Sequence, residues 1–256
     1  MIMAVDIGNT NTKIGIFEDR KIITTLRVSN SSVKTSDEYG FYVKNILGGQ
    51  GIDVSKITGA IMSSVNPNYN YTFEHMLSAH FKVKPLIVGA GIKTGIKIKY
   101  DNPKELGSDR IMDCVGAWHT YGGECIVVDC GTATTFNVLS AEGEFLGGLI
   151  SFGLKSGSDA LSSSAAKLPK VELVRPSVVV GKNTISNMQS GIILGYTGMI
   201  EYIISKIREE SGKNYRVIAT GGLSQVVADC SKVFDIVDRT LTLKGLCITY
   251  NLNNPA

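Results

Sequence analysis

Alternating apolar and polar residues predict two β-hairpins with the same pattern. Residues 3–7 are apolar except for Asp6, lead into an Asp-x-Gly turn rich in asparagine and threonine, and resume as an alternating run at 12–17. Residues 126–130 repeat this order around Asp129 and resume at 135–139. Each copy is typical of a hairpin. A common turn type would explain one copy, but a carboxylate ending both apolar strands is costly unless it is paired or binds a cation.

The pattern after each hairpin predicts a third strand and then strands alternating with helices. In the first half we expect strands at 21–28, 59–65 and 85–88, and helices from the capping box at 35–38 to about 47, at 71–81 and at 111–119. In the second half we expect strands at 144–150, 215–220 and 233–237, and helices at 159–167, 186–211, after Gly222 and from Leu241. Because Asp6 and Asp129 lie about half of the 256-residue chain apart, this order predicts an α/β protein of two similar domains with a ligand between them.

Composition narrows the function classes. A hydrophobic share of 43% with 19% charged residues argues against disorder. The net charge is +3 and the basic residues are scattered, so no nucleic-acid partner is expected. No apolar run approaches the roughly 18 residues of a membrane span, and Asp6 interrupts the first apolar run. The sequence therefore predicts a cytoplasmic protein with no membrane partner.

Cysteine and histidine do not form recognisable metal motifs. The five cysteines include no Cys-x-x-Cys pair and are interpreted as buried thiols. His75 and His80 are five residues apart, whereas a helical zinc pair sits at i, i+4.

The two Asp-x-Gly turns carry the candidate chemistry. Backbone N–H groups of such turns, with the hydroxyl, amide and ammonium groups of residues 9–13, can bind phosphate. Asp6 and Asp129 are hard oxygen ligands suited to Mg²⁺ or a monovalent cation. This set favours phosphoryl transfer from a nucleoside triphosphate. No P-loop or Gly-x-Gly-x-x-Gly motif is present, and residues 220–222 fit either an adenosine contact or an ordinary tight turn.

A phosphoryl acceptor needs a base, and Asp109 is the candidate. It stands beside Arg110 in a predicted loop that contains Pro103. A carboxylate beside an arginine on a loop usually forms a solvated ion pair. Alternatively, Asp109 accepts a hydroxyl proton while Arg110 binds an anionic substrate group and Gly107 admits the substrate.

Several motifs occur in order over nearly the whole chain. They are Asp6-x-Gly8-Asn9-Thr10-x-x-Lys13, Ser63-Ser64-Val65-x-Pro67, Tyr100 followed by Gly107-x-Asp109-Arg110, Asp129-x-Gly131-Thr132-Ala133-x-Thr135, Gly147-Gly148 and Thr220-Gly221-Gly222. No one motif is diagnostic, but the set resembles type III pantothenate kinase.

The resemblance implies two ribonuclease-H-like domains of the acetate kinase, sugar kinase and actin-like ATPase superfamily. Residues 1–115 would carry the first phosphate loop and residues 116–256 the second, with the active site in the cleft between them. The implied reaction is ATP-dependent phosphorylation of pantothenate to 4'-phosphopantothenate, the first step of coenzyme A biosynthesis. Mg²⁺ and a monovalent cation, K⁺ or NH₄⁺, would assist a homodimeric enzyme.

The resemblance also assigns roles to residues. Asp109 would be the general base, Asp129 the monovalent-cation ligand, and Asp6 is a candidate Mg²⁺ ligand. ATP and phosphate binding falls to Asp6, Ile7, Gly8, Asn9, Thr10, Asn11, Thr12, Lys13 and Thr132. Pantothenate binding falls to Tyr100, Gly107, Ser108, Asp109, Arg110 and Thr184, with Thr184 acting across the homodimer interface.

One position departs from the family pattern. Phe152 stands where the family usually has proline, so the wall of the substrate pocket is expected to differ. Two other functions fit the same fold: a nucleotide or polyphosphate phosphohydrolase, and a non-catalytic transcriptional accessory factor. The retained acids Asp6, Asp109 and Asp129 argue against a purely binding role.

Overall fold

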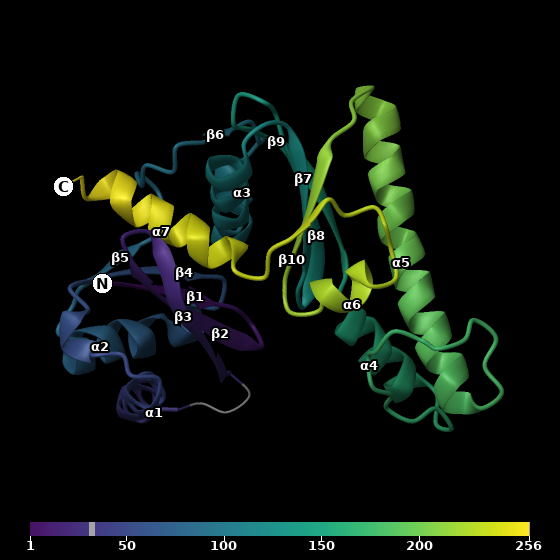
Figure 1. Ribbon diagram of the computed structural model, residues 1–256, viewed down its shortest axis with the longest axis horizontal. Helices are drawn as coiled ribbons and strands as arrows, with labels where there is room; N and C mark the ends of the chain where they lie inside the picture. The colour runs from purple at the N-terminus through teal and green to yellow at the C-terminus, as the bar shows by residue number, and fades with distance from the viewer. Residues whose placement is uncertain (31–33, 256) are drawn as a thin grey trace. The chain divides into compact units, whose positions relative to one another are not determined.

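The chain divides into two units in the computed structural model, which describes residues 1–30 and 34–255. Unit 1 comprises Met1–Ile96, Asp101–Thr120 and Leu241–Ala256. Unit 2 comprises Lys97–Tyr100 and Tyr121–Thr240. Each unit contains one mixed β-sheet with helices packed on it (Figure 1).

The sheet of unit 1 has five strands in the order β3-β2-β1-β4-β5. They are β1 (Ile2–Ile7), β2 (Asn11–Glu18), β3 (Lys21–Ser29), β4 (Gly59–Ser64) and β5 (Pro85–Ile87). β1, β2 and β3 are antiparallel, whereas β4 and β5 run parallel to β1. The helices of this unit are α1 (Ser36–Gly49), α2 (Asn70–Phe81), α3 (Ser108–Tyr121) and α7 (Leu241–Asn253), with short 3-10 turns η1 (Val54–Lys56), η2 (Pro67–Tyr69) and η3 (Pro103–Glu105).

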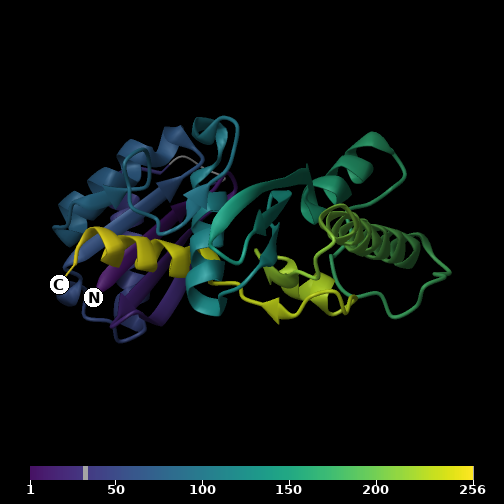
Figure 2. The ribbon, with the colours of Figure 1, turned by 90° about the horizontal axis from the view of Figure 1, so that it is seen from above.

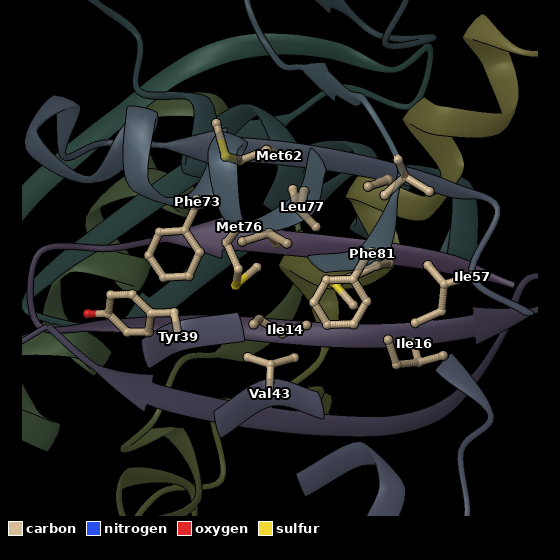
Figure 3. Close-up of a cluster of buried hydrophobic side chains, with 14 of the residues drawn as sticks. Ile14, Ile16, Tyr39, Val43, Ile57, Met62, Phe73, Met76, Leu77 and Phe81 are labelled. Carbon is tan, nitrogen blue, oxygen red and sulfur yellow. The ribbon is translucent and has the colours of Figure 1, made fainter. Parts of the chain in front are cut away.

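Side-chain alternation along β1 gives each face of this sheet a different role. Met3, Val5 and Ile7 pack into a buried cluster with α1 and α2, which Figure 3 shows around Tyr39 and Phe73. Residues of the opposite parity, including Ala4, face a second cluster formed with α3 and α7. Because side chains alternate with period two, Asp6 shares the face of Ala4 and lies on the side that carries α3.

The predicted capping box at the start of α1 is confirmed. The Thr35 hydroxyl accepts the backbone N–H of Glu38 at 3.2 Å, and the Glu38 carboxylate accepts the backbone N–H of Thr35 at 2.8 Å. This reciprocal pair satisfies two N–H groups that the first turn of a helix leaves unbonded.

The sheet of unit 2 has six strands in the order β11-β10-β7-β8-β9-β6. They are β6 (Lys97–Ile98), β7 (Cys125–Cys130), β8 (Ala133–Leu139), β9 (Glu144–Phe152), β10 (Arg216–Thr220) and β11 (Ile236–Val237). Without the edge strand β6 and read in the opposite direction, the order β9-β8-β7-β10-β11 corresponds strand by strand to β3-β2-β1-β4-β5 of unit 1. The predicted repeat is therefore present in the topology of the two sheets. The helices are α4 (Leu154–Ser164), α5 (Thr184–Ser211) and α6 (Ser224–Ala228), and α5 is seen close to end-on in Figure 2.

The observed units differ from the two sequence halves expected from the repeat. The expected boundary between residues 115 and 116 falls inside α3, a helix that packs on the sheet of unit 1 through Met112 and Val115. The final helix α7 also belongs to unit 1, because Leu243 and Leu246 complete the same cluster. A side chain at Gly245 would collide with the Met112 carbonyl of α3, so the glycine permits close packing of the two helices.

Among the described residues, no helix has both the length and the apolar character needed to cross a bilayer.

Candidate active-site residues in each unit

Three polar side chains meet at the ends of the central strands of unit 1. Asp6 is paired in register with Lys13 of β2 and with Ser63 of β4, so all three side chains project from the same face. The Ser63 hydroxyl donates to Asp6 Oδ1 at 3.2 Å, and Lys13 Nζ lies 3.9 Å from Asp6 Oδ2. The strand register thus brings a carboxylate, an ammonium and a hydroxyl together.

The surroundings of Asp6 disfavour its ionised form. The residue is only 7% exposed, and burial raises the pKa of its carboxyl above the usual value. The negative charge of Asp109 raises this pKa further, whereas Lys13 and the Ser63 hydrogen bond lower it. The net direction is upward, so the ionised carboxylate lacks some of the stabilisation that water would supply. A cation beside Asp6 would supply that stabilisation.

Asp109 lies in the first turn of α3, which begins at Ser108 and not at residue 111 as the sequence pattern predicted. The Ile111 N–H donates to the Gly107 carbonyl, so helical hydrogen bonding begins at Gly107. The carboxylate accepts the backbone N–H of Arg110 at 2.7 Å. A side chain at Gly107 would come within 2.6 Å of Asp109 Oδ1, so glycine provides the space in which the carboxylate is held. A helix N-terminus also favours a negative charge.

Two neighbours of Asp109 are fixed in unit 1. The Ser108 hydroxyl donates to the Ser64 carbonyl at 3.1 Å and thereby ties the start of α3 to the end of β4. Arg110 is buried, with 6% of its surface exposed. A buried guanidinium is costly unless anionic or carbonyl groups surround it, which makes Arg110 suited to bind an acidic group and equally to a structural role.

The first loop, residues 8–11, is a tight turn between β1 and β2. The Gly8 N–H donates to the Asn11 carbonyl at 3.1 Å, and a side chain at Gly8 would approach that carbonyl to 2.9 Å. Asn9 and Thr10 at the tip are exposed. Ile7 and Thr12, both expected to bind ATP or phosphate, have fully buried side chains, so only their backbone groups could take part. The Thr12 hydroxyl donates to Asn30, a residue that no sequence motif indicated.

Asp129 is the last residue but one of β7 in unit 2, the position that Asp6 holds in β1. It is in register with Thr220 of β10 and with Thr135 of β8. Gly221 has a φ of +96°, and a side chain there would collide with Asp129 Oδ1 and with the Cys130 backbone. Only glycine combines this φ with this close approach, so the turn after β10 is built around the Asp129 carboxylate.

The loop between β7 and β8, residues 131–132, is the candidate second phosphate loop and is held by α4 and the residue before it. Ser156 donates its hydroxyl to the Thr132 carbonyl at 2.8 Å. Gly153 lies so close to the carbonyls of Gly131 and Thr132 that any side chain there would overlap them. The loop backbone is therefore fixed, while the Thr132 side chain remains exposed.

The remaining predicted substrate residues are in unit 2. The Tyr100 ring packs edge-on against Phe145, with ring centroids 5.8 Å apart. Thr184 is the first residue of α5 and is exposed. Phe152, at the end of β9, is 57% exposed, and its ring lies over Gly157 of α4 and 6.3 Å from the Tyr196 ring.

The donor atoms decide which cations the residues could hold. Within residues 1–30 and 34–255, no three His, Cys, Asp or Glu side chains gather into a metal-binding group. Each aspartate is instead accompanied by hydroxyl groups, at Ser63 for Asp6 and at Thr135 and Thr220 for Asp129 in the strand register. Such hard oxygen donors fit Mg²⁺ or an alkali cation whose coordination is completed by water or phosphate oxygens.

The fold is shared with solved structures of low sequence identity. A Campylobacter jejuni protein described as a Baf family transcriptional activator matches with a TM-score of 0.62 and 18% identity, over 99% of this chain and 100% of that chain. A Sinorhizobium meliloti protein described as a 2-dehydro-3-deoxygalactonokinase matches with a TM-score of 0.59 and 11% identity, over 100% and 98%. The activator of 2-hydroxyisocaproyl-CoA dehydratase from Clostridium difficile, solved with ADPNP, matches with a TM-score of 0.53 and 13% identity, over 98% and 94%.

These similarities define the fold class, an α/β protein with two mixed sheets. Residues 2–206 match the family of type III pantothenate kinases, which is most of the chain. The chain therefore belongs to the type III pantothenate kinase family, a family of phosphotransferases. The family assignment implies pantothenate phosphorylation in coenzyme A biosynthesis.

Proposed function

We propose that this chain transfers the γ-phosphate of ATP to pantothenate and that Asp109 is the general base. The observation that supports this assignment most strongly is the placement of Asp109 in the first turn of α3, the helix that packs on the face of the sheet carrying Asp6, Lys13 and Ser63. A proton acceptor and candidate phosphate and cation ligands thus occur within one unit.

In the proposed reaction, the Asp109 carboxylate accepts the proton of the pantothenate primary hydroxyl. The alkoxide oxygen forms a bond to the γ-phosphorus as the bond between that phosphorus and the bridging oxygen breaks, and ADP leaves with the bond electrons. The backbone N–H of Arg110, already donated to Asp109 Oδ1, orients the carboxylate for this transfer. Gly107, Ser108 and Arg110 are proposed to bind pantothenate beside the base.

The phosphate-binding roles are proposed for each unit separately. In unit 1, the exposed tip at Asn9 and Thr10 and the Lys13 ammonium are suited to phosphate oxygens. In unit 2, Thr132 is proposed to bind phosphate and Asp129 a monovalent cation. Bound cations would neutralise the charge of the phosphates, with Asp6 as a Mg²⁺ ligand. Ile7 and Thr12 are assigned to the support of the first loop because their side chains are buried.

A homodimer is proposed to complete the pantothenate site. Val179 and Val180, ahead of α5, are 74% and 82% exposed, and Ile185 on its first turn is also exposed. A groove of about 530 Å³ beside α5 includes Thr184 and Met188 in its lining. Exposed apolar side chains in one place favour contact with another protein surface, and Thr184 is proposed to contact pantothenate bound to the partner subunit.

The test is a coupled assay of ADP formation with ATP, Mg²⁺, K⁺ and pantothenate. We expect ADP formation that depends on pantothenate and yields 4'-phosphopantothenate. Absence of pantothenate-dependent ADP formation across pH and across K⁺, NH₄⁺ and Na⁺ would contradict the proposal. Phosphate release without pantothenate would instead indicate a phosphohydrolase.

The cation role of Asp129 is tested by titrating K⁺ against activity. The Asp129→Asn variant is expected to require more K⁺ or to lose its K⁺ response. Glu142→Gln, an exposed acid in the same unit, is the matched control and should keep the wild-type response.

A further inference from the structure

Asn30, directly after β3, uses both its side chain and its backbone to hold the first loop of unit 1. Its Nδ2 donates to the Gly8 carbonyl at 2.8 Å, and its Oδ1 accepts the Thr12 hydroxyl at 3.1 Å. Its backbone N–H donates to the Thr10 carbonyl at 2.9 Å, and its own carbonyl accepts the Tyr69 hydroxyl at 2.7 Å. The residue is 8% exposed. Three residues of the loop region are therefore bonded to one buried asparagine.

The two side-chain contacts require one orientation of the amide. A rotated amide would place two acceptors face to face at Gly8, so the paired contacts identify which end is the donor. The turn itself is closed by the Gly8 N–H to Asn11 carbonyl hydrogen bond. Contacts to Asn30 bracket this turn on both sides and fix the carbonyl of Thr10 at its tip.

A path of hydrogen bonds continues from Asn30 to the start of α3. The backbone N–H of Tyr69 donates to the Asn66 carbonyl, and the Asn66 N–H donates to the Ser64 hydroxyl, both at 3.1 Å. The Ser64 carbonyl accepts the Ser108 hydroxyl at 3.1 Å. Ser108 directly precedes Asp109, so the loop and the turn that carries the candidate base share one set of supports.

We propose that Asn30 is a positioning residue that sets the shape of the first phosphate loop and thereby the affinity for ATP. This inference rests on the proposed function, in which that loop binds the phosphates. Asn30 makes no contact with the nucleotide in this proposal. It acts through Gly8, Thr10 and Thr12, and an incorrect loop shape would misplace the groups that bind phosphate.

The test uses substitutions that keep side-chain shape. Asn30→Asp keeps Oδ1 but replaces the Nδ2 donor with an oxygen opposite the Gly8 carbonyl. Tyr69→Phe removes only the hydroxyl that supports Asn30. Tyr39→Phe is the matched control. The Tyr39 hydroxyl donates at 3.3 Å to the carbonyl of Ser29, the residue before Asn30, and makes no hydrogen bond to Asn30 itself.

Binding of ADPNP without pantothenate is measured by calorimetry, with thermal unfolding recorded for each variant. We expect Asn30→Asp to raise the Kd for ADPNP about tenfold, the scale of one buried hydrogen bond. Tyr69→Phe should raise it about threefold, and Tyr39→Phe should leave it unchanged at a similar loss of stability. In assays of turnover, the KM for ATP should rise for Asn30→Asp more than the KM for pantothenate.

The Kd values decide the inference. An Asn30→Asp protein that is folded and binds ADPNP like the wild type would overturn it. If Asn30→Asp does not fold, Tyr69→Phe decides: a wild-type Kd, or a rise matched by Tyr39→Phe, would overturn it. Wild-type protein that binds ADPNP but does not phosphorylate pantothenate contradicts the proposed function alone, whereas failure to bind ADPNP contradicts both.

Discussion

Replacing Asp109 with asparagine tests the general base with little change in shape. Asparagine keeps an oxygen that can accept the Arg110 N–H, now at 2.7 Å from Asp109 Oδ1, and the space above Gly107 is unaltered. The helix start is therefore expected to persist, while the proton acceptor is lost. General-base catalysis contributes about 10²- to 10⁴-fold, so kcat should fall by that factor, or about 3–5 kcal/mol in activation free energy.

A second measurement separates loss of the base from general damage. Asp109 raises the pKa of Asp6 through its negative charge, so the Asp109→Asn variant should show a lower Asp6 pKa when the carboxyl is titrated by NMR. Glu74→Gln removes one exposed acid from α2 of the same unit and is the control. It should keep both kcat and the Asp6 pKa at wild-type values.

The reasoning would be refuted by an Asp109→Asn enzyme whose kcat stays within a few-fold of the wild type. An unchanged Asp6 pKa in that variant would show that the two carboxylates do not interact. A large loss of kcat together with a loss of folded protein would assign Asp109 a structural role in α3.

Three further outcomes are expected from the structure. Because folding raises the pKa of Asp6, the contribution of this residue to the free energy of unfolding is favourable below the unfolded pKa of about 3.9 and is lost as pH rises through the folded pKa. The Asp6→Asn variant should therefore unfold at a higher denaturant concentration than the wild type at pH 7.5, and the two midpoints should coincide near pH 3; a difference that does not change with pH would contradict this. Gly221→Ala should lower stability by more than the roughly 1–3 kcal/mol of a strained φ and by more than Gly212→Ala, which has a φ of +67° in open space; equal melting temperatures would refute the packing argument. Val180→Asp should shift a homodimer toward monomer in analytical ultracentrifugation, whereas Tyr71→Asp, an exposed aromatic in unit 1, should not; two identical profiles would count against the proposed interface.

Local features of this protein could be predicted from the sequence because their causes are local. Alternation with period two identified both hairpins, and the residues from Thr35 to Glu38 identified the capping box that the structure contains. The repeated Asp-x-Gly pattern anticipated the shared strand order of the two sheets. Helix ends were less accurate, since α3 begins three residues earlier than its apolar pattern suggests.

Contacts between distant segments required the tertiary structure. The sequence could not place α7 in unit 1, because an apolar pattern does not name the sheet on which a helix packs; the contacts of Leu243 and Leu246 and the close approach of Gly245 to α3 appear only in the structure. Asn30 carries no motif, and its importance arises from four hydrogen bonds to residues up to 39 positions away. The sequence by itself predicted both hairpins, their turns and the candidate acidic residues, since alternation and turn residues are local signals, whereas the short strand β6 had no such signal. Which of those residues act on one another was decided by strand register and helix packing, through which the negative charge of Asp109, far along the chain from Asp6, raises the pKa of the Asp6 carboxyl.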